Sequence, residues 1–392
     1  MRSITLRPEA HRRLLFGHPW IYSNEIVMDA GTKALPPGSV VRLLRANGDA
    51  VALAFFNPHT LIACRVLTHR LDAAIDARFL ADRLLSATNL RDRLYDRPFY
   101  RLIHAEADGF PGTVVDRFGG LLVAQINSAG MELLLPELLE ALDRVLAPEA
   151  VLLRCDSPAR MAEGLPSYVK FAKGSLDGPL ELEENGLRFL ADPQAGQKTG
   201  WFFDQRDNRA AVARLAAGLS VLDVYSYAGG FALAAAKAGA REVTCIDRSE
   251  PALALAERSA AANGLAAHCR FRRAEAFEEL ERLGGTGTRF GMVVADPPAF
   301  VKSKKELKQG ARAYRKLARL AASLVEPEGF LFIASCSHNM PVEEFERQVA
   351  RGLVDASREG RILRAAGAAA DHPVHPALPE SAYLKSLLLQ LD

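Results

Sequence analysis

Residues 221–247, VLDVYSYAGGFALAAAKAGAREVTCID, read as a strand, a glycine turn, a helix and a second strand. The run from Val221 to Val224 is short and apolar, which is typical of a strand covered on both faces. Gly229 and Gly230 allow a tight turn, and the alanine-rich residues 231–238 favour a helix. The stretch therefore predicts an open α/β sheet, in which ligands bind beyond the carboxyl ends of the strands.

Asp247, at the end of the second strand, lies eighteen residues after Gly229, where an acid can hold ribose hydroxyls. This spacing fits a dinucleotide or S-adenosylmethionine (SAM). The turn lacks the G-x-G-x-x-G pattern of a pyrophosphate site. Asp223 beside the turn would repel a diphosphate but suits the ammonium of a methionine moiety. On this stretch alone, SAM and an ordinary βαβ unit without a ligand remain equally open.

Length and composition limit the class of protein. The 392 residues are enough for two to three domains with buried cores. The five cysteines (64, 155, 245, 269 and 336) form no C-x-x-C pair, which argues against a zinc site or a disulfide framework. No signal-peptide core or membrane-spanning run is present. We therefore expect a cytoplasmic protein with no metal and no membrane partner.

Charge is distributed unevenly along the chain. Residues 1–70 carry nine basic and four acidic residues, whereas residues 71–190 carry thirteen and nineteen. Such asymmetry is compatible with a polyanionic partner, but on charge alone ordinary surface variation is the favoured explanation.

Residues 1–70 predict a small β-rich domain. Strand-like runs at 40–44, 50–56 and 61–67 are separated by turn residues, Asn47-Gly48 among them. Basic and aromatic residues alternate before these runs, a pattern that can bind phosphates and stack bases. The candidates are Arg12, Arg13 and Trp20, although Trp20 also fits a half-buried core position. The segment HPWIYSNEI resembles PUA domains, which are compact RNA-binding pseudobarrels.

Residues 71–190 predict a second, α+β domain. A helix at 72–94 is followed by strands, an amphipathic helix at 131–146 and a hairpin around Asn185-Gly186. His104 lies in a polar cluster with Arg101, Glu106 and Asp108. These side chains either brace the turn at 108–112 or contact a substrate. The third domain then covers residues 191–392.

Two further strand ends carry chemistry in this third domain. Asp296-Pro297-Pro298 follows the apolar run 292–295, and the prolines hold the aspartate at the strand end. Cys336 follows the apolar run 330–334. A free cysteine is usually an inert buried residue, but this position beside a predicted site favours a nucleophile. Between them, residues 301–316 are strongly basic and suit a flexible flap over a phosphate backbone. Its candidate RNA contacts are Lys302, Lys304, Lys305, Arg312 and Tyr314.

The segments QKTGWFFDQRDNR, DVYSYAGGF, CID, AEAF, DPPAF and SCSH, in this order after a PUA-like start, resemble the bacterial 23S rRNA cytosine-5 methyltransferases of the RlmI type. The resemblance covers nearly the whole chain. It implies a PUA domain, a middle domain of the EEHEE kind, and a C-terminal Rossmann-like class I methyltransferase. It also implies SAM as cofactor, with 23S rRNA or a large-subunit assembly intermediate as partner. The implied cofactor contacts are Gln205, Arg206, Asn208, Asp223, Tyr225, Gly229, Asp247, Arg248, Glu275, Ala276, Asp296 and Pro297.

The chemistry implied by the resemblance is covalent. Carbon 5 of cytosine is a poor nucleophile, and addition of a thiolate at carbon 6 activates it. Cys336 is the implied thiolate, and Asp296 is expected to hydrogen-bond the N3/N4 edge of the ring. Two alternatives stay open: a guanine or base-amino methyltransferase that uses Asp296 without a covalent cysteine, and a non-catalytic RNA-binding module with a SAM fold. The oligomeric state is also open, a homodimer included.

Overall fold

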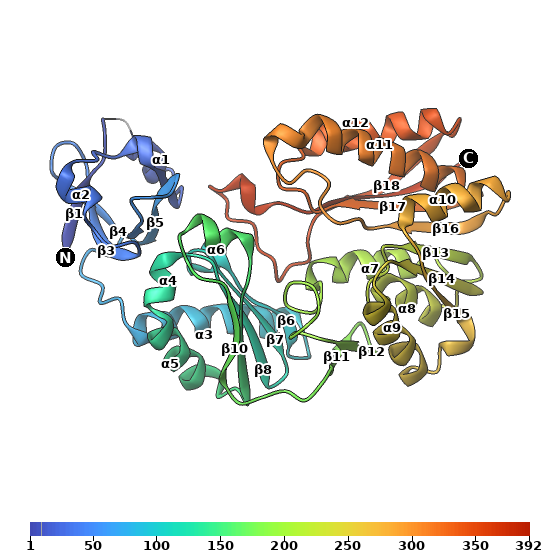
Figure 1. Ribbon diagram of the computed structural model, residues 1–392, viewed down its shortest axis with the longest axis horizontal. Coiled ribbons are helices and arrows are strands. Elements are labelled where there is room, and N and C mark those ends of the chain that lie inside the picture. Colours follow the sequence, from blue (N-terminus) through green and yellow to red (C-terminus); the bar gives the residue numbers. More distant parts are fainter. Residues whose placement is uncertain (9) are drawn as a thin grey trace. The chain divides into compact units, whose positions relative to one another are not determined.

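In the computed structural model, which describes residues 1–8 and 10–392, the chain folds into two compact units (Figure 1). Unit 1 comprises Met1–Gly178, Asp192–Trp201 and Ala370–Ser381, and unit 2 comprises Pro179–Ala191, Phe202–Ala369 and Ala382–Asp392. The chain thus leaves each unit and returns to it. No helix within the described residues is both long enough and apolar enough to cross a membrane.

The first sheet of unit 1 lies at the N-terminus, and its strand order is β1-β3-β4-β5-β2. Its elements are β1 (Arg2–Thr5), α1 (His11–Leu15), β2 (Trp20–Tyr22), α2 (Ala30–Lys33), β3 (Ser39–Leu44), β4 (Ala50–Phe56) and β5 (Ile62–Thr68). Strands β3 and β4 pair antiparallel across the Asn47-Gly48 turn, as the sequence predicts. The core of this sheet is apolar and includes Ile4, Leu6 and Phe56. Close packing makes it a compact β-rich domain.

The second sheet of unit 1 has the strand order β10-β9-β8-β7-β6. Its elements are α3 (Ala77–Leu94), β6 (Phe99–His104), β7 (Thr113–Phe118), β8 (Leu121–Ile126), α4 (Ala129–Leu133), α5 (Leu135–Leu146), β9 (Ala150–Cys155), α6 (Pro158–Ala162) and β10 (Tyr168–Lys173). The helix expected at 131–146 is interrupted at Leu134, and α5 restarts with a proline in its first turn. Phe55 of β4 packs into this second core, and a Cβ on Gly130 would lie 2.0 Å from its ring.

Unit 2 is built on a sheet with the order β15-β14-β13-β16-β17-β19-β18. Its elements are β11 (Leu180–Glu184), β12 (Leu187–Ala191), α7 (Arg206–Ala213), β13 (Ser220–Val224), α8 (Gly230–Lys237), β14 (Glu242–Asp247), α9 (Glu250–Ala262), β15 (Cys269–Arg273), α10 (Ala276–Gly285), β16 (Phe290–Ala295), α11 (Leu307–Ser323), β17 (Val325–Ser335), α12 (Val342–Asp355), β18 (Gly360–Ala366) and β19 (Lys385–Leu391). Strands β13 to β17 run parallel, and β19 runs antiparallel between β17 and β18. This is the open α/β sheet predicted from residues 221–247.

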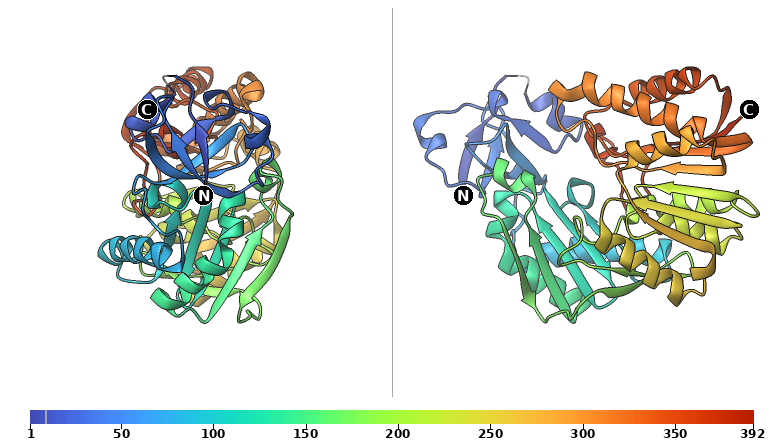
Figure 2. Two further views of the ribbon diagram at one scale, coloured as in Figure 1. Left: turned by 90° about the vertical axis from the view of Figure 1, so that its left-hand side faces the viewer. Right: turned by 45° about the vertical axis from the view of Figure 1, so that its right-hand side comes forward.

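Helices cover both faces of the sheet of unit 2. Leu222 and Val224 pack into one core with α10, α11 and α12. Asp223, between them in β13, points to the other face, where it contacts the first turn of α8. Figures 1 and 2 show α11 and α12 on one side of the strands and α8 and α9 on the other. Strands covered in this way are buried throughout, as β13 and β16 are.

The division of the chain differs from the expected domain boundary at residue 190. The hairpin β11–β12 belongs to unit 2, whereas residues 192–201 return to unit 1. Glu184 of this hairpin forms ion pairs with Arg206 and Arg209 of α7, and Ser259 of α9 accepts a hydrogen bond from the amide of Leu190. The buried ion pairs with α7 and the hydrogen bond to α9 hold the hairpin in unit 2.

Candidate active site

The turn between β13 and α8 has an unusual backbone. Tyr225 and Tyr227 have φ values of 65° and 48°, a region that bulky residues rarely adopt, and Gly229 has 79°. The amide of Ser226 donates to the carbonyl of Ile246, which holds the turn against β14. A Cβ on Gly229 would lie 2.8 Å from a methyl carbon of Leu233, so glycine is required there for packing as well as for its φ angle.

Three carboxylates gather at the ends of neighbouring parallel strands. Asp223, Asp247 and Asp296 close β13, β14 and β16, and β13 lies between the other two. The Oδ2 atom of Asp223 accepts from the amide of Ala232 at 3.0 Å. Asp247, the last residue of β14, accepts a hydrogen bond from the amide of Tyr227 at 2.9 Å and so stabilises the turn after β13. The charges of Asp247 and Asp296 disfavour a further negative charge on Asp223 and favour a cationic ligand.

The buried polar atoms near these carboxylates test whether a cationic cofactor fits. Asp223 is 1% exposed, and among the described residues its Oδ1 atom has no hydrogen-bond partner. Oδ1 of buried Asn208 and Oγ of buried Ser226 also lack a partner there. Burial, and then the charges of Asp296 and Asp247, raise the pKa of Asp223 to about 8, although the amide of Ala232 opposes this shift. An ammonium group could donate hydrogen bonds to these oxygens and a sulfonium would add a favourable positive charge, whereas a diphosphate would add repulsion. The residues therefore fit SAM.

Residues 205–209, predicted as the rim of the cofactor site, form a network. Nε2 of Gln205 donates to Oδ1 of Asp296 at 2.9 Å, and Nδ2 of Asn208 donates to Oε1 of Gln205 at 2.7 Å. Arg206 and Arg209 form buried ion pairs with Glu184, at 3.5 and 2.7 Å. Sequence reasoning did not identify Glu184, because it lies in a hairpin that the chain order assigned to the preceding domain.

The two predicted catalytic residues lie at the same edge of the sheet. Strands β16 and β17 are parallel neighbours, with Ala295 opposite Ile333, and Asp296 and Cys336 follow them. The Sγ atom of Cys336 is 3.9 Å from the carbonyl oxygen of Pro297. The five cysteines, all among the described residues, form no disulfide bond; four of them are buried, whereas Cys336 is partly exposed. The arrangement places the least buried cysteine beside the Asp-Pro-Pro turn.

The remaining predicted cofactor residues lie just beyond the ends of β13, β14, β15 and β16. Arg248 is exposed, Pro297 is buried, and Tyr225 is half-buried. Glu275 is exposed at the start of α10, and Ala276 is buried behind it. Burial, and then the charge of Glu275, raise the pKa of Tyr225, so this tyrosine stays protonated near neutral pH.

The basic segment at 301–316 was expected to be a flexible flap, but most of it is helical. A short 3-10 turn at Lys304–Glu306 leads into α11, and Ser303 and Glu306 form a capping box. Lys302, Lys304, Lys305 and Arg312 are exposed, as RNA contacts require. Tyr314 is wrong as an RNA contact, because it is 0% exposed and lies on the buried helix face with Gly310 and Leu317. The helical period places it in the core.

The RNA candidates of the first domain have partners within unit 1. Arg12 is exposed, and Arg13 forms an ion pair with Glu25 at 3.1 Å while lining a hollow with exposed Phe16. Nε1 of the half-buried Trp20 donates to Glu106 at 2.7 Å. Trp20 is therefore held by the second sheet and offers part of its ring to solvent.

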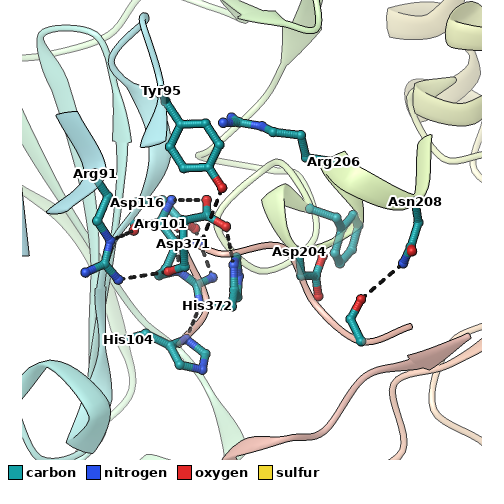
Figure 3. Close-up of polar contacts among 12 residues, drawn as sticks. Arg91, Tyr95, Arg101, His104, Asp116, Asp204, Arg206, Asn208, Asp371 and His372 are labelled. Atoms are coloured by element: carbon teal, nitrogen blue, oxygen red, sulfur yellow. Dashed lines mark hydrogen bonds and ion pairs between the residues drawn. The ribbon is translucent and has the colours of Figure 1, made fainter. Parts of the chain in front are cut away.

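His104 belongs to a dense polar cluster of unit 1, drawn in Figure 3. Arg101 lies 3.1 Å from its Nδ1 atom and pairs with Asp116, and Arg91 pairs with Asp108. The returning segment 370–381 joins this cluster. The carboxylate of Asp371 accepts from the amide of Arg101, and His372 lies 2.8 Å from that carboxylate. These contacts support the bracing role for the cluster.

Comparisons with known proteins agree with this architecture. Residues 4–69 match the profile of PUA-like domains, and residues 167–390 match that of S-adenosylmethionine-dependent methyltransferases. The chain is 38% identical, over 95% of both proteins, to the ribosomal RNA large subunit methyltransferase I of Erwinia tasmaniensis. It is 37% identical, over 99% of both, to the protein of the same name from Shewanella frigidimarina. A solved structure from Streptococcus mutans, described as a SAM-dependent methyltransferase, matches 100% of both chains with a TM-score of 0.84 at 20% identity.

The α/β sheet, its acid-lined strand ends and the matching profile define a SAM-dependent methyltransferase, with SAM as its cofactor. The chain belongs to the ribosomal RNA large subunit methyltransferase I family. The predicted fold class is thereby confirmed: a PUA-like domain, a middle mixed sheet and a C-terminal Rossmann-like sheet. The methyltransferase profile covers the hairpin β11–β12 of unit 2 and also includes β10 of unit 1.

Proposed function

We propose that this protein methylates carbon 5 of a cytosine in 23S rRNA through a covalent adduct with Cys336. The observation that carries this proposal is the position of the partly exposed Cys336, whose Sγ atom is 3.9 Å from the Pro297 carbonyl, next to Asp296 at the carboxyl edge of the sheet. The relatives named above are ribosomal RNA methyltransferases, which supports the substrate class. A substrate in the ribosome implies that the protein acts in the cytoplasm.

In the proposed reaction the Cys336 thiolate adds to carbon 6 of the cytosine. The electrons of the carbon 5–carbon 6 double bond then make carbon 5 nucleophilic. SAM, when bound, supplies a methyl group on a sulfonium, which carbon 5 attacks. Loss of the carbon 5 proton to a base restores the double bond and expels the Cys336 thiolate. The cysteine therefore ends the cycle unchanged.

Asp296 is proposed to hydrogen-bond the N3/N4 edge of the cytosine. Addition of a thiolate places negative charge on the ring, and a proton shared between Asp296 and N3 offsets it. Gln205 donates to Oδ1 of Asp296 and fixes its orientation, and the adjacent prolines restrict its backbone. Asp296 thus links the cofactor network at 205–209 to the target base.

RNA is proposed to bind through two sets of side chains. Arg12, Arg13 and Trp20 lie in unit 1, and Lys302, Lys304, Lys305 and Arg312 lie in unit 2. Cations of this kind bind phosphates, and a partly exposed indole can stack on an unpaired base. His104 is left out of this set, because its contact with Arg101 supports a bracing role. The substrate is 23S rRNA or an assembly intermediate that contains it.

The proposed function is tested by mass mapping of 23S rRNA from cells that lack the protein. We expect one cytosine to lose a methyl group at carbon 5, and the wild-type gene to restore it. A lost methyl group on a guanine or on an exocyclic amine would instead support the reaction without a covalent cysteine. An unchanged methylation pattern, together with no SAM binding, would favour a non-catalytic RNA-binding module.

Binding of SAM is expected to release a proton from Asp223, which we propose holds the ammonium of the methionine moiety. Because its pKa is about 8 in the free protein, Asp223 is mostly protonated at pH 7. A neighbouring cation favours the carboxylate, so affinity should rise as pH rises toward 8. Calorimetry at pH 7 in two buffers of different ionisation enthalpy should detect about one released proton.

The matched variant for this prediction is Asp223→Asn. It should bind SAM roughly 10- to 100-fold more weakly and release no proton, because an amide cannot ionise. Glu343→Gln removes an exposed acid from the first turn of α12 and should behave like the wild type. Equal proton release by D223N and the wild type would contradict the assignment of Asp223.

A further inference from the structure

Lys385 is a buried cation that the reaction described above does not use. It is the first residue of β19. In the antiparallel pairing of β19 with β17 it lies opposite Ser335, the residue that precedes Cys336. Its side chain is only 6% exposed. A lysine is rarely buried to this extent without an acidic partner, because desolvation of the ammonium is costly. The position therefore calls for a specific interaction.

The ammonium of Lys385 closes the turn that follows Cys336. Its Nζ atom donates to the carbonyl of Ser337 at 2.7 Å and to that of Met340 at 2.8 Å. The amide of Met340 donates to the carbonyl of Ser337, so both ends of the turn are tied to one cation. Within the described part of the chain, no carboxylate forms an ion pair with this lysine.

Neutral groups hold the residues on either side of Cys336. The hydroxyl of buried Tyr314 lies 2.8 Å from Oγ of Ser335 and 2.9 Å from Oγ of Ser337. Oγ of Ser337 also accepts from the amide of Val301, which links this turn to the chain after Asp296. Tyr314 thus anchors the loop from α11, while Lys385 brings the positive charge from β19.

The charges around Lys385 favour an anion at Cys336. Burial lowers the pKa of Lys385 to about 8, and a negative charge on Cys336 opposes this shift. Burial is the main cause that raises the pKa of Tyr314 on the other side of the loop, and a negative charge on Cys336 adds to it, whereas the hydrogen bonds with Ser335 and Ser337 oppose the shift. Lys385 therefore remains mainly protonated at pH 7 and loses its charge as pH rises through 8.

We propose that Lys385 is a positioning residue for Cys336, whose buried ammonium holds the turn at 337–340 and stabilises the thiolate form of the cysteine. The inference rests on the proposed role of Cys336 as nucleophile. The antiparallel strand β19 would then have two roles: it pairs with β17 in the sheet, and it supplies the lysine that prepares the nucleophile. Lys385 supplies the positive charge, and the carbonyls of Ser337 and Met340 fix the position of its ammonium.

The experiment measures alkylation of Cys336 by iodoacetamide as a function of pH, with peptide mass spectrometry to identify the modified cysteine. The full-length protein is used, and the four buried cysteines serve as internal references. In Lys385→Met the inflection of the profile should move up by about one pH unit, and alkylation at pH 7 should be ~tenfold slower. Lys385→Arg should restore the wild-type inflection, because it keeps the charge.

A purely structural role gives a different result. Loosening of the turn in K385M would change the alkylation rate at every pH and leave the inflection unmoved, which would overturn the proposal. Tyr314→Phe, which removes a neutral anchor, should show this structural pattern. If K385M fails to fold, Lys385→Gln provides the test, since its amide can still donate to a carbonyl but carries no charge.

The readout is independent of methyl transfer. If Cys336→Ala keeps full activity, the proposed function fails, yet the alkylation profiles still report the coupling between Lys385 and Cys336. If the profiles of K385M and the wild type coincide while C336A is inactive, this inference alone fails. SAM affinity, measured for each variant, should stay at the wild-type value and shows that unit 2 remains folded.

Discussion

Replacement of Cys336 by alanine is expected to abolish methyl transfer, with kcat lowered by at least about 10⁴-fold. Without thiolate addition, carbon 5 of cytosine lacks the electron density to attack a methyl sulfonium. The side chain is small and partly exposed, so its loss should change neither the fold nor SAM affinity. The measurement is single-turnover methyl transfer to 23S rRNA, with SAM binding followed by calorimetry.

The matched control is Cys269→Ala, at the start of the edge strand β15, which should retain activity. RNA that carries 5-fluorocytosine adds a direct readout, because fluorine at carbon 5 cannot leave as a proton and the adduct accumulates. The wild type and C269A should both form a stable covalent complex, and C336A should form none. An active C336A would favour a guanine or amino-group methyltransferase that relies on Asp296.

Replacement of Asp296 by asparagine is expected to lower kcat by roughly 10²- to 10³-fold. The amide keeps the size of the side chain, and its Oδ1 atom can still accept from Gln205. It cannot share a proton with N3, so the charge that forms on thiolate addition is no longer offset. Steady-state kinetics should show this loss in kcat, with little change in the KM for RNA.

The covalent trap separates Asp296 from Cys336. D296N should still form the adduct with 5-fluorocytosine RNA, only more slowly, since its thiol is intact. Glu343→Gln, an exposed acid on α12, controls for removal of one negative charge. Activity of D296N close to that of the wild type would show that Asp296 does not act on the base.

Much of the active site could be predicted because its residues directly follow buried apolar runs. Asp223, Asp247, Asp296 and Cys336 lie at or close to the ends of β13, β14, β16 and β17, and β13, β16 and the second half of β17 are visible as apolar stretches. Parallel strands bring their carboxyl ends to one edge, so the approximate location of the site follows from the order of the elements. Local signals such as the glycine turn and the paired prolines strengthen each assignment.

Other assignments depended on contacts that no local signal reports. Tyr314 stands among cations in the sequence, which suggested RNA, yet the helical period turns it into the core. The hairpin β11–β12 follows the middle domain in the sequence, yet Glu184 pairs with arginines of α7. Lys385 lies some fifty residues after Cys336, and only the antiparallel register of β17 and β19 brings them together.

The sequence by itself determined the parallel strands of the sheet of unit 2, because apolar periodicity, glycine and proline act over a few residues. The cofactor class and the candidate nucleophile came from the order of motifs along the chain, which resembles a known family. The tertiary structure decided which charges face one another: Glu184 with Arg206 and Arg209, Asp296 with Gln205, and Lys385 with the turn after Cys336. Such pairings depend on packing and strand register between segments far apart in the chain. Their strength also depends on burial, which exists only once the chain has folded.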